Sequence, residues 1–199
     1  MPPETIFSIA IVGSHNPAIH HPLWYGAKKL VAEEEAKAAA GPQLLCSGEI
    51  TVFTIRELEI FCNREVWRVS TKSRYADAIK LAKDVFTHLD DTPTTKWGVN
   101  LDYAYGTNAL KLLAAVDASS LLGKGPTTEV HTKTKTPLQG THWARVVTGP
   151  DGLLFLNNFE YLSTAKGHFD LAPLLDNAVT EAEQLTKETK ALIDARIKP

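Results

Sequence analysis

The spacing of hydrophobic residues divides the chain into segments of period two, typical of strands, and segments of three-and-four spacing, typical of helices. The apolar run Ile6–Val12 ends at Gly13 and predicts a buried strand. Residues 22–40 predict one helix, because a glycine and a proline follow it directly. The residues expected to face inward from this helix are Trp24, Ala27, Leu30 and Val31.

Residues 44–71 predict two or three strands. The first of them has no sharp boundary, and its apolar markers are Phe53, Ile55, Leu58, Ile60 and Cys62. A plausible turn at residues 63–65 leads into a strand at Val66–Ser70.

Residues 71–106 predict a capped amphipathic helix followed by a long strand, and the rest of the chain is expected to be organised around them. Thr71 or Ser73 can cap the helix, and Pro93 ends it because proline disfavours helical dihedrals in the preceding residue. The apolar face of the helix is expected at Ala76, Ile79, Ala82, Val85, Phe86 and Leu89. One face of the strand is expected at Trp97, Val99, Leu101 and Tyr103.

The remaining residues predict a helix, three strands and a long final helix. Asn108 can cap a helix that runs through Leu121. Residues 127–136 alternate threonine with charge, which suits a solvated or edge strand. Residues 143–148 and 153–159 flank a Gly-Pro-Asp-Gly segment and predict a hairpin. The last helix, from about residue 170 to residue 198, carries an apolar stripe at Leu171, Leu174, Leu175, Ala178, Ala182, Leu185 and Leu192.

This element order predicts an α+β fold with antiparallel sheets that have helices on one face. Both halves of the chain show the order strand, helix, strands, helix, so we expect two pseudo-repeated halves, residues 1–92 and 93–199, fused into one globular unit. No repeat is visible at the level of individual residues. An exposed sheet face is then the natural place for a ligand.

Composition and charge narrow the classes of function. The net charge of −2 gives no global electrostatic reason to expect nucleic acid or an anionic membrane as a partner. No stretch approaches the roughly 18 consecutive apolar residues of a membrane span. The two cysteines, Cys46 and Cys62, have no metal-type spacing, and we expect both to be buried and reduced in the cytoplasm.

Three histidines lie close together in the loop before the first helix, at His15, His20 and His21. Imidazoles at this distance can bind a transition metal. However, no carboxylate or thiolate of the segment completes a ligand set, and the spacing matches no zinc motif. We therefore interpret the segment as a proline-rich loop whose polar residues cap the following helix, and we predict no metal and no cofactor.

Dispersed His and Asp residues offer the only candidate enzymatic site. His131 and His142 lie on neighbouring strands, and Asp90 and Asp91 follow His88 at the end of the central helix. Nothing in the sequence orients a base toward a nucleophile, so no catalytic residue is assigned. Phosphate-binding, dinucleotide-binding, hydrolase and metalloprotease motifs are absent from the sequence. We interpret all four tryptophans, Trp24, Trp67, Trp97 and Trp143, as core residues.

The segment Glu57–Tyr103 resembles a sporadically distributed, uncharacterised family of bacterial proteins. The features that carry the resemblance are a strand hairpin, a helix that ends in Leu89-Asp90-Asp91-Thr92-Pro93, and the strand segment Trp97-Gly98-Val99-Asn100. The opening Asn16-Pro17 and Pro22-Leu23-Trp24 are also similar to that family. The resemblance implies no reaction and no cofactor.

Taken together, the sequence favours a non-enzymatic binding or assembly subunit of a cytoplasmic bacterial complex. The final helix is expected to overhang its own sheet beyond Leu185, so that Leu192, Ile193 and Ile197 form an interface with a protein partner or a second copy. For this segment, the alternative is a helix that frays in solvent past Lys187. The alternatives are an enzyme built from the dispersed His and Asp residues and a nucleic-acid-binding protein. The nucleic-acid alternative uses Lys133, Lys135 and Arg145 on an open sheet face.

Overall fold

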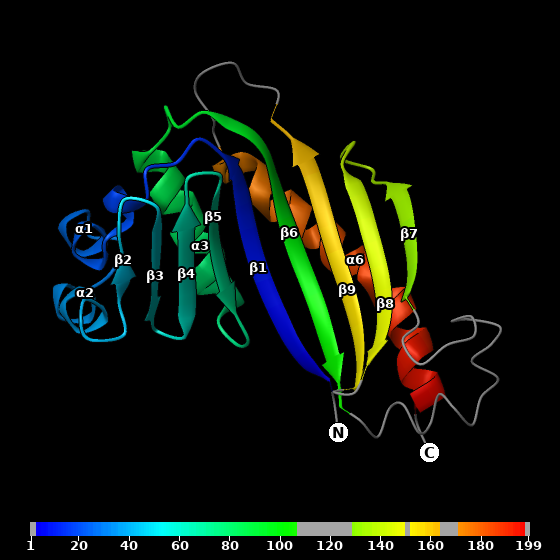
Figure 1. Cartoon of the computed structure of the whole chain (residues 1–199). Coiled ribbons are helices and arrows are strands. Elements are labelled where there is room, and N and C mark those ends of the chain that lie inside the picture. The colour runs from blue at the N-terminus through cyan, green and yellow to red at the C-terminus, as the bar shows by residue number, and fades with distance from the viewer. Residues whose placement is uncertain (1–2, 107–128, 150–151, 164–170, 198–199) are drawn as a thin grey trace. The chain divides into compact units, whose positions relative to one another are not determined.

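The computed structural model describes residues 3–106, 129–149, 152–163 and 171–197. The chain is a mixed α+β protein with a large antiparallel sheet (Figure 1). Its strands hydrogen-bond in the order β2-β3-β4-β5-β1-β6-β9-β8-β7. The predicted helix after Gly106 lies outside the described residues. None of the helices in the described ranges is long and apolar enough to cross a membrane.

The chain forms two compact units, which we call the N unit and the C unit. The N unit comprises residues 7–98 and 161–177, and the C unit comprises residues 1–6, 99–160 and 178–199. The units interleave along the sequence because four elements contribute to both, namely β1 (Glu4–Gly13), β6 (Thr94–Tyr105), β9 (Gly152–Leu162) and α6 (Ala172–Ile197). They are described separately below.

The N unit contains a strand meander and the helix that the sequence places at its centre. Its strands are β2 (Leu45–Cys46), β3 (Ile50–Ile55), β4 (Leu58–Asn63) and β5 (Val66–Thr71). Helix α3 (Tyr75–His88) follows, and Thr71 Oγ1 accepts hydrogen bonds from the N–H groups of Ser73 and Arg74 just before it. The buried face of α3 is Ala78, Leu81, Ala82, Val85 and Phe86, so Ala76, which is exposed, was wrongly assigned to it.

The predicted helix at residues 22–40 is wrong as a single element. The chain forms a 3-10 helix η1 (Pro17–His20), then α1 (Pro22–Ala27) and α2 (Glu33–Ala39). Lys29 lies between α1 and α2 with a φ of 58°, which breaks the helix. The two helices pack closely enough that a Cβ at Gly26 would lie 2.8 Å from Ala36 Cβ. Tyr25 is fully buried on this segment, whereas Ala27 is exposed.

Residues 44–71 form four strands rather than two or three. Arg56 and Glu57 both have positive φ, 50° and 65°, and make the tight turn between β3 and β4. Such a two-residue turn normally attracts asparagine or glycine, so its sequence does not mark it. The predicted turn at residues 63–65 is confirmed, because Asn63 Oδ1 accepts hydrogen bonds from the N–H groups of Glu65 and Val66.

The C unit contains the residues of β6 from Val99 onward, with β7 (Glu129–Lys135), β8 (Thr141–Gly149) and β9 (Gly152–Leu162). The predicted β8–β9 hairpin and the edge position of β7 are confirmed. Gly152 has a φ of +127° and lies so close to the Tyr105 carbonyl that a Cβ there would be 2.2 Å from its oxygen. Glycine is therefore required at the start of β9.

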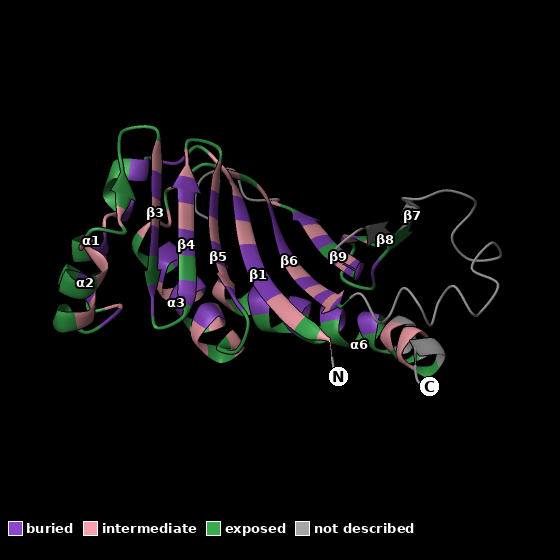
Figure 2. Ribbon diagram, turned by 60° about the horizontal axis from the view of Figure 1, so that its bottom comes forward, coloured by how far each residue is buried: buried purple, intermediate pink, exposed green. Residues whose placement is uncertain are grey.

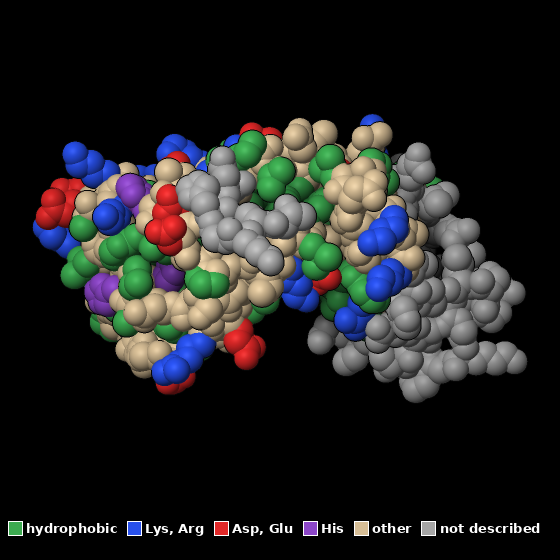
Figure 3. Space-filling model, turned by 90° about the horizontal axis from the view of Figure 1, so that it is seen from above, with side chains coloured by type: hydrophobic (Ala, Val, Ile, Leu, Met, Phe, Trp, Pro, Cys, Tyr) green, Lys and Arg blue, Asp and Glu red, His purple; other side chains and the backbone are tan. Residues whose placement is uncertain are grey.

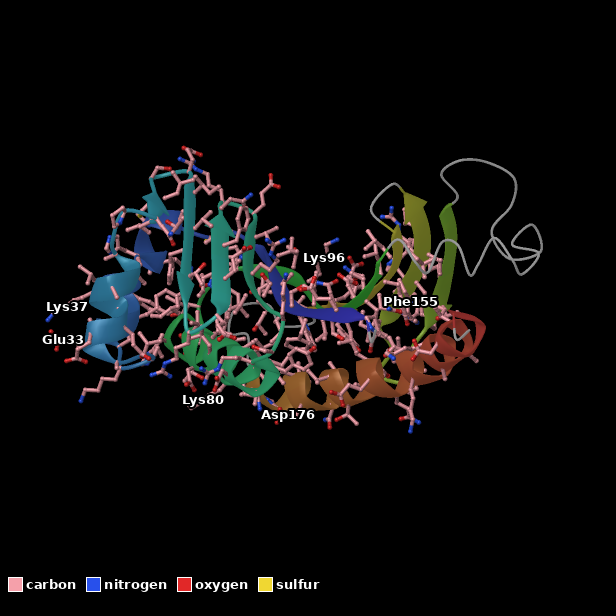
Figure 4. All side chains as sticks on the ribbon, turned by 90° about the horizontal axis from the view of Figure 1, so that it is seen from below. Glu33, Lys37, Lys80, Lys96, Phe155 and Asp176 are labelled. Atoms are coloured by element: carbon pink, nitrogen blue, oxygen red, sulfur yellow. The ribbon has the colours of Figure 1, made fainter. Side chains whose placement is uncertain are left out.

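Helix α6 (Ala172–Ile197) covers one face of the C unit's strands through its buried residues Ala178, Ala182 and Thr186. The alternation of buried and exposed residues along β9 is visible in Figure 2. Phe155, labelled in Figure 4, is fully buried on the strand face that α6 covers, and its ring stacks on Tyr103 with centroids 5.9 Å apart.

The expectation that α6 overhangs its sheet beyond Leu185 is wrong. The Tyr105 hydroxyl donates a hydrogen bond to Asp194 Oδ1 at 2.9 Å, and Lys190 Nζ lies 5.5 Å from the centroid of the Tyr103 ring. Lys190 also pairs with Asp194 one turn later. The last turns of α6 therefore follow β6, held by polar contacts that apolar spacing does not reveal.

Candidate functional site

Trp143 is the exposed aromatic residue of the C unit's sheet, and its position follows from the strand register. It lies on β8 opposite Lys133 of β7 and Asn158 of β9. Because successive residues of a strand face opposite sides, its neighbour His142 is buried while the Trp143 side chain is 36% exposed. The expectation that Trp143 is a core residue is therefore wrong, while Trp67 and Trp97 are buried as expected.

A lysine lies over the exposed ring. Lys133 Nζ is 4.3 Å from the centroid of the Trp143 indole. The ring face carries negative electrostatic potential and attracts a cation, an interaction of about 0.5–1 kcal/mol at an exposed site. The Lys133 ammonium thus occupies one face of this electron-rich, flat ring.

The surroundings of this ring carry more positive than negative charge. Lys135 lies opposite Thr141, and Arg145 lies opposite Leu156, both in register with the face of Trp143. Glu160 of β9 and Asp102 of β6 are the carboxylates among the described side chains of this face. We call this surface the open face and define it by Lys133, Lys135, Trp143, Arg145, Leu154 and Asn158, all of which are exposed.

The predicted residues Lys133, Lys135 and Arg145 are thus brought together by β7 and β8. Figure 3 shows one face of the molecule, on which several Lys and Arg side chains lie close together. The sequence identified these cations but missed the aromatic residue between them. The observation that places Trp143 among them is its cross-strand pairing with Lys133, which only the strand register of the structure shows.

The opposite side of the same strands holds a buried polar network. His142 Nε2 donates a hydrogen bond to Asn157 Oδ1 at 3.1 Å, and Asn157 Nδ2 donates one to the Leu101 carbonyl at 2.9 Å. The His142 ring stacks on Phe159 with centroids 4.1 Å apart. Burial lowers the pKa of His142. This histidine is therefore positioned as a neutral donor within the core.

The register separates the two histidines of the predicted enzymatic site. Residue 131 pairs with Arg145, whereas His142 pairs with Thr134 and Phe159. The two positions differ by an odd number of residues along the ladder, so they belong to alternate faces. Asp90 and Asp91 follow α3 in the N unit, where His88 lies edge-on to Trp24 with ring centroids 6.4 Å apart.

Asp102 lies beside the network, on β6. Its Oδ1 atom accepts a hydrogen bond from the Asn157 backbone N–H at 2.8 Å. Burial raises the pKa of Asp102 to about 6, although this hydrogen bond acts in the opposite direction. A partly buried carboxylate with a raised pKa is a feature of many functional sites and also of structural networks.

The histidine loop of the N unit forms a buried cluster. The indole N–H of Trp67 donates to the Tyr25 hydroxyl at 3.1 Å, which leaves the hydroxyl hydrogen to donate to His20 Nδ1 at 3.1 Å. His15 Nε2 donates to the Ile11 carbonyl at 3.0 Å. Burial lowers the pKa of His20 to about 3, and it also lowers the pKa of His15.

The loop caps helices, as predicted, through two of its polar side chains. His21 Nδ1 accepts a hydrogen bond from the Leu23 N–H, and Asn16 Oδ1 accepts one from the Ala18 N–H. Within the described ranges, no three His, Cys, Asp or Glu side chains are grouped so that they could hold a metal ion. Cys62 is buried, but Cys46 is exposed, so the expectation that both cysteines are buried is wrong for Cys46.

The residues predicted for a protein interface lie in the last turns of α6. Ile193 is half-buried there, and the side chains of Leu192 and Ile197 lie outside the described part of the structure.

A comparison with protein-family models finds no match for this chain, and a comparison with curated proteins finds no similar sequence.

Proposed function

We propose that this chain is a non-enzymatic binding protein that holds single-stranded nucleic acid on the open face of its C unit. The observation that carries the proposal is the exposed Trp143 ring with the Lys133 ammonium over it. Single-stranded nucleic acids bind proteins by stacking bases on aromatic rings while cations contact the phosphates. The open face supplies one such ring and three cations.

The overall charge of −2 does not oppose this assignment, because a ligand responds to the local field of the surface it approaches. A base that stacks on Trp143 replaces the Lys133 ammonium on the ring, and Lys133 is then free to pair with the adjacent phosphate. Arg145 and Lys135 lie on the same strands within reach of the next phosphates. Asn158, opposite Trp143, offers an amide for a base edge.

The experiment is a fluorescence-anisotropy titration of labelled oligouridine and oligothymidine at low salt. Trp143→Ala should weaken binding by about tenfold, because stacking on one aromatic ring contributes roughly 1–3 kcal/mol per base. Lys133→Ala should also weaken it. Its matched control is Lys187→Ala, since Lys187 is an exposed lysine on α6, away from the open face. Flat titrations with the wild-type chain would overturn the proposal.

A second proposed role is assembly through α6, as the residues Leu192, Ile193 and Ile197 suggest. Support comes from Leu185, which lies on the same helix with 36% of its side chain exposed. Leu185→Glu should reduce any self-association measured by sedimentation, without unfolding the chain. A wild-type chain that sediments as a monomer at all concentrations would remove this role.

We further propose that the fold consists of two pseudo-repeated halves with helices on one face. The support is strand order, which runs β1-β5-β4-β3-β2 in the first half and β6-β9-β8-β7 in the second, so that the two orders match except for the additional short strand β2. In each order the first strand of the half is followed by its last strand and then by the preceding ones.

We also propose that the chain belongs to the uncharacterised bacterial family that it resembles and that it is located in the cytoplasm. The free thiols of Cys46 and Cys62 support the cytoplasmic location.

A further inference from the structure

The N unit also has a cation over an aromatic ring on the strand face that is turned away from its core. Phe61 lies on β4, half-buried, between Val52 of β3 and Arg68 of β5. The Arg68 guanidinium carbon is 5.4 Å from the centroid of the Phe61 ring. The neighbours of Phe61 along β4, Ile60 and Cys62, are both fully buried. The Phe61 ring therefore lies on the opposite side of β4 from the core.

The two aromatic rings lie on corresponding strands of their units, whereas their cations come from opposite neighbours, β5 for Arg68 and β7 for Lys133. Phe61 lies on β4, between β3 and β5, and Trp143 lies on β8, between β7 and β9. Each ring is covered by a cation from a directly hydrogen-bonded strand. Packing of a core does not require an aromatic ring and a cation on the solvent face of a sheet. Their occurrence in both units indicates a shared use.

Arg68 has hydrogen-bonding capacity that the described residues do not use. Its Nη2 atom donates to Glu59 Oε1 at 3.1 Å, while its Nε–H is buried and makes no hydrogen bond to the described part of the chain. The Arg68 side chain as a whole is nevertheless 42% exposed, so a ligand can reach other donors of its guanidinium. Because guanidinium matches phosphate geometry through paired donors, this exposed cation suits a phosphate.

The residue beside this pair is small. Ala10 of β1 lies opposite Arg68 on the side away from Phe61. A flat ligand can therefore approach Arg68 from that side without meeting a bulky side chain at position 10. A nucleobase on the Phe61 ring, with its phosphate at Arg68, fits the aromatic surface and the exposed cation together.

We propose that Phe61 and Arg68 form a second base-stacking site for single-stranded nucleic acid, in the N unit. This inference rests on the proposed function, because it assigns the same class of ligand. At this site Phe61 stacks with a base and Arg68 binds the phosphate next to it. Glu59, which pairs with Arg68, competes with that phosphate for the guanidinium.

The test is ultraviolet crosslinking of oligouridine to the full chain, followed by tryptic digestion and mass spectrometry. Cleavage after lysine and arginine places Phe61 in the peptide of residues 57–64 and Trp143 in the peptide of residues 136–145. We expect crosslinks in both peptides. Phe61→Leu, which keeps the apolar volume but removes the ring, should reduce crosslinking of residues 57–64 by about tenfold and leave residues 136–145 unchanged.

Two further variants separate stacking from a change in folding. Arg68→Lys keeps the charge but loses the planar donor set, and should also reduce the crosslink at residues 57–64. Glu59→Gln removes the carboxylate that competes for Arg68 and should preserve or increase crosslinking at residues 57–64. Each variant is compared with the wild-type chain by thermal unfolding.

Crosslinks confined to residues 136–145, with Trp143→Ala still weakening binding, would overturn the second site and leave the proposed function standing. Crosslinks at residues 57–64 that persist in both Phe61→Leu and Arg68→Lys would also overturn it. The absence of any crosslink, together with flat anisotropy titrations, would overturn the second site and the proposed function alike.

Discussion

The Tyr25 hydroxyl joins Trp67 to His20 in the core of the N unit, accepting from the Trp67 indole and donating to the His20 ring, each at 3.1 Å. All three side chains are almost completely buried. One hydroxyl thus satisfies polar atoms on three elements, namely η1, α1 and β5. This arrangement explains why the histidine loop, which resembles a ligand set in the sequence, is part of the core.

Tyr25→Phe should destabilise the chain by about 1–3 kcal/mol for each buried polar atom left without a partner. The measurement is the free energy of unfolding in urea. Tyr75→Phe is the matched control, because the Tyr75 ring packs on Phe7 with centroids 5.1 Å apart while its hydroxyl makes no hydrogen bond to the described residues. Equal destabilisation by the two variants would contradict the bridging role of Tyr25.

The state of His20 predicts a dependence of stability on pH. Its pKa is about 3 in the folded chain because of burial, with a smaller contribution from His15, and 6.5 in the unfolded chain. The unfolded chain therefore binds more protons between these values, so this histidine's contribution to stability falls as pH is lowered from 6.5 toward 3. Ring resonances of His20 should show no titration above pH 5. A midpoint near pH 6.5 would contradict the burial.

Asp102 predicts a pH dependence of stability that is opposite in sign to that of His20. Its pKa is about 6 in the folded chain and 3.8 in the unfolded chain, so the folded chain binds more protons between these values. Its contribution to stability therefore falls as pH rises from 3.8 through 6. Asp102→Asn keeps an oxygen that can accept from the Asn157 N–H and should raise the melting temperature at pH 8. It should have much less effect at pH 4.

The control for this prediction is Glu183→Gln, which neutralises an exposed carboxylate on α6. A similar gain at pH 8 from both variants would show that net charge, rather than the burial of Asp102, sets the effect.

Much of the fold follows from the sequence because period-two spacing identifies strands well. The long strand with Trp97, Val99 and Leu101 on one face is confirmed, as is the β8–β9 hairpin. The positions at which elements end were harder to predict. Lys29 and Arg56 adopt positive φ without being glycine, so nothing in their residue type marks the break after α1 or the β3–β4 turn.

The candidate site shows the same limit. Trp143, Arg145 and Val147 alternate with His142, Ala144 and Val146, so neither set is clearly more hydrophobic. Pattern alone assigned Trp143 to the core, because tryptophan is usually buried. The register with β9 decides otherwise, since His142 pairs with the buried Phe159 and Trp143 with the exposed Asn158. The partner strand, absent from any local pattern, determines which face is open.

Binding at the open face should depend on salt. If Lys133, Lys135 and Arg145 each neutralise one phosphate, the logarithm of the association constant should fall against the logarithm of salt concentration with a slope of about −2. Lys133→Ala should make that slope less negative by about 0.7. Lys187→Ala should leave it unchanged. A slope near zero would show that these cations do not contact phosphate.

The most direct measurement of the central claim is a nuclear magnetic resonance titration of the tryptophan indole N–H signals with oligouridine. The Trp143 signal is assigned by its loss in Trp143→Phe, and Trp97 serves as an internal control because its ring is buried and stacks on Tyr161. The account predicts that the Trp143 signal shifts progressively with added oligouridine while the Trp97 signal does not. A Trp143 signal that stays in place while oligouridine binds would contradict it.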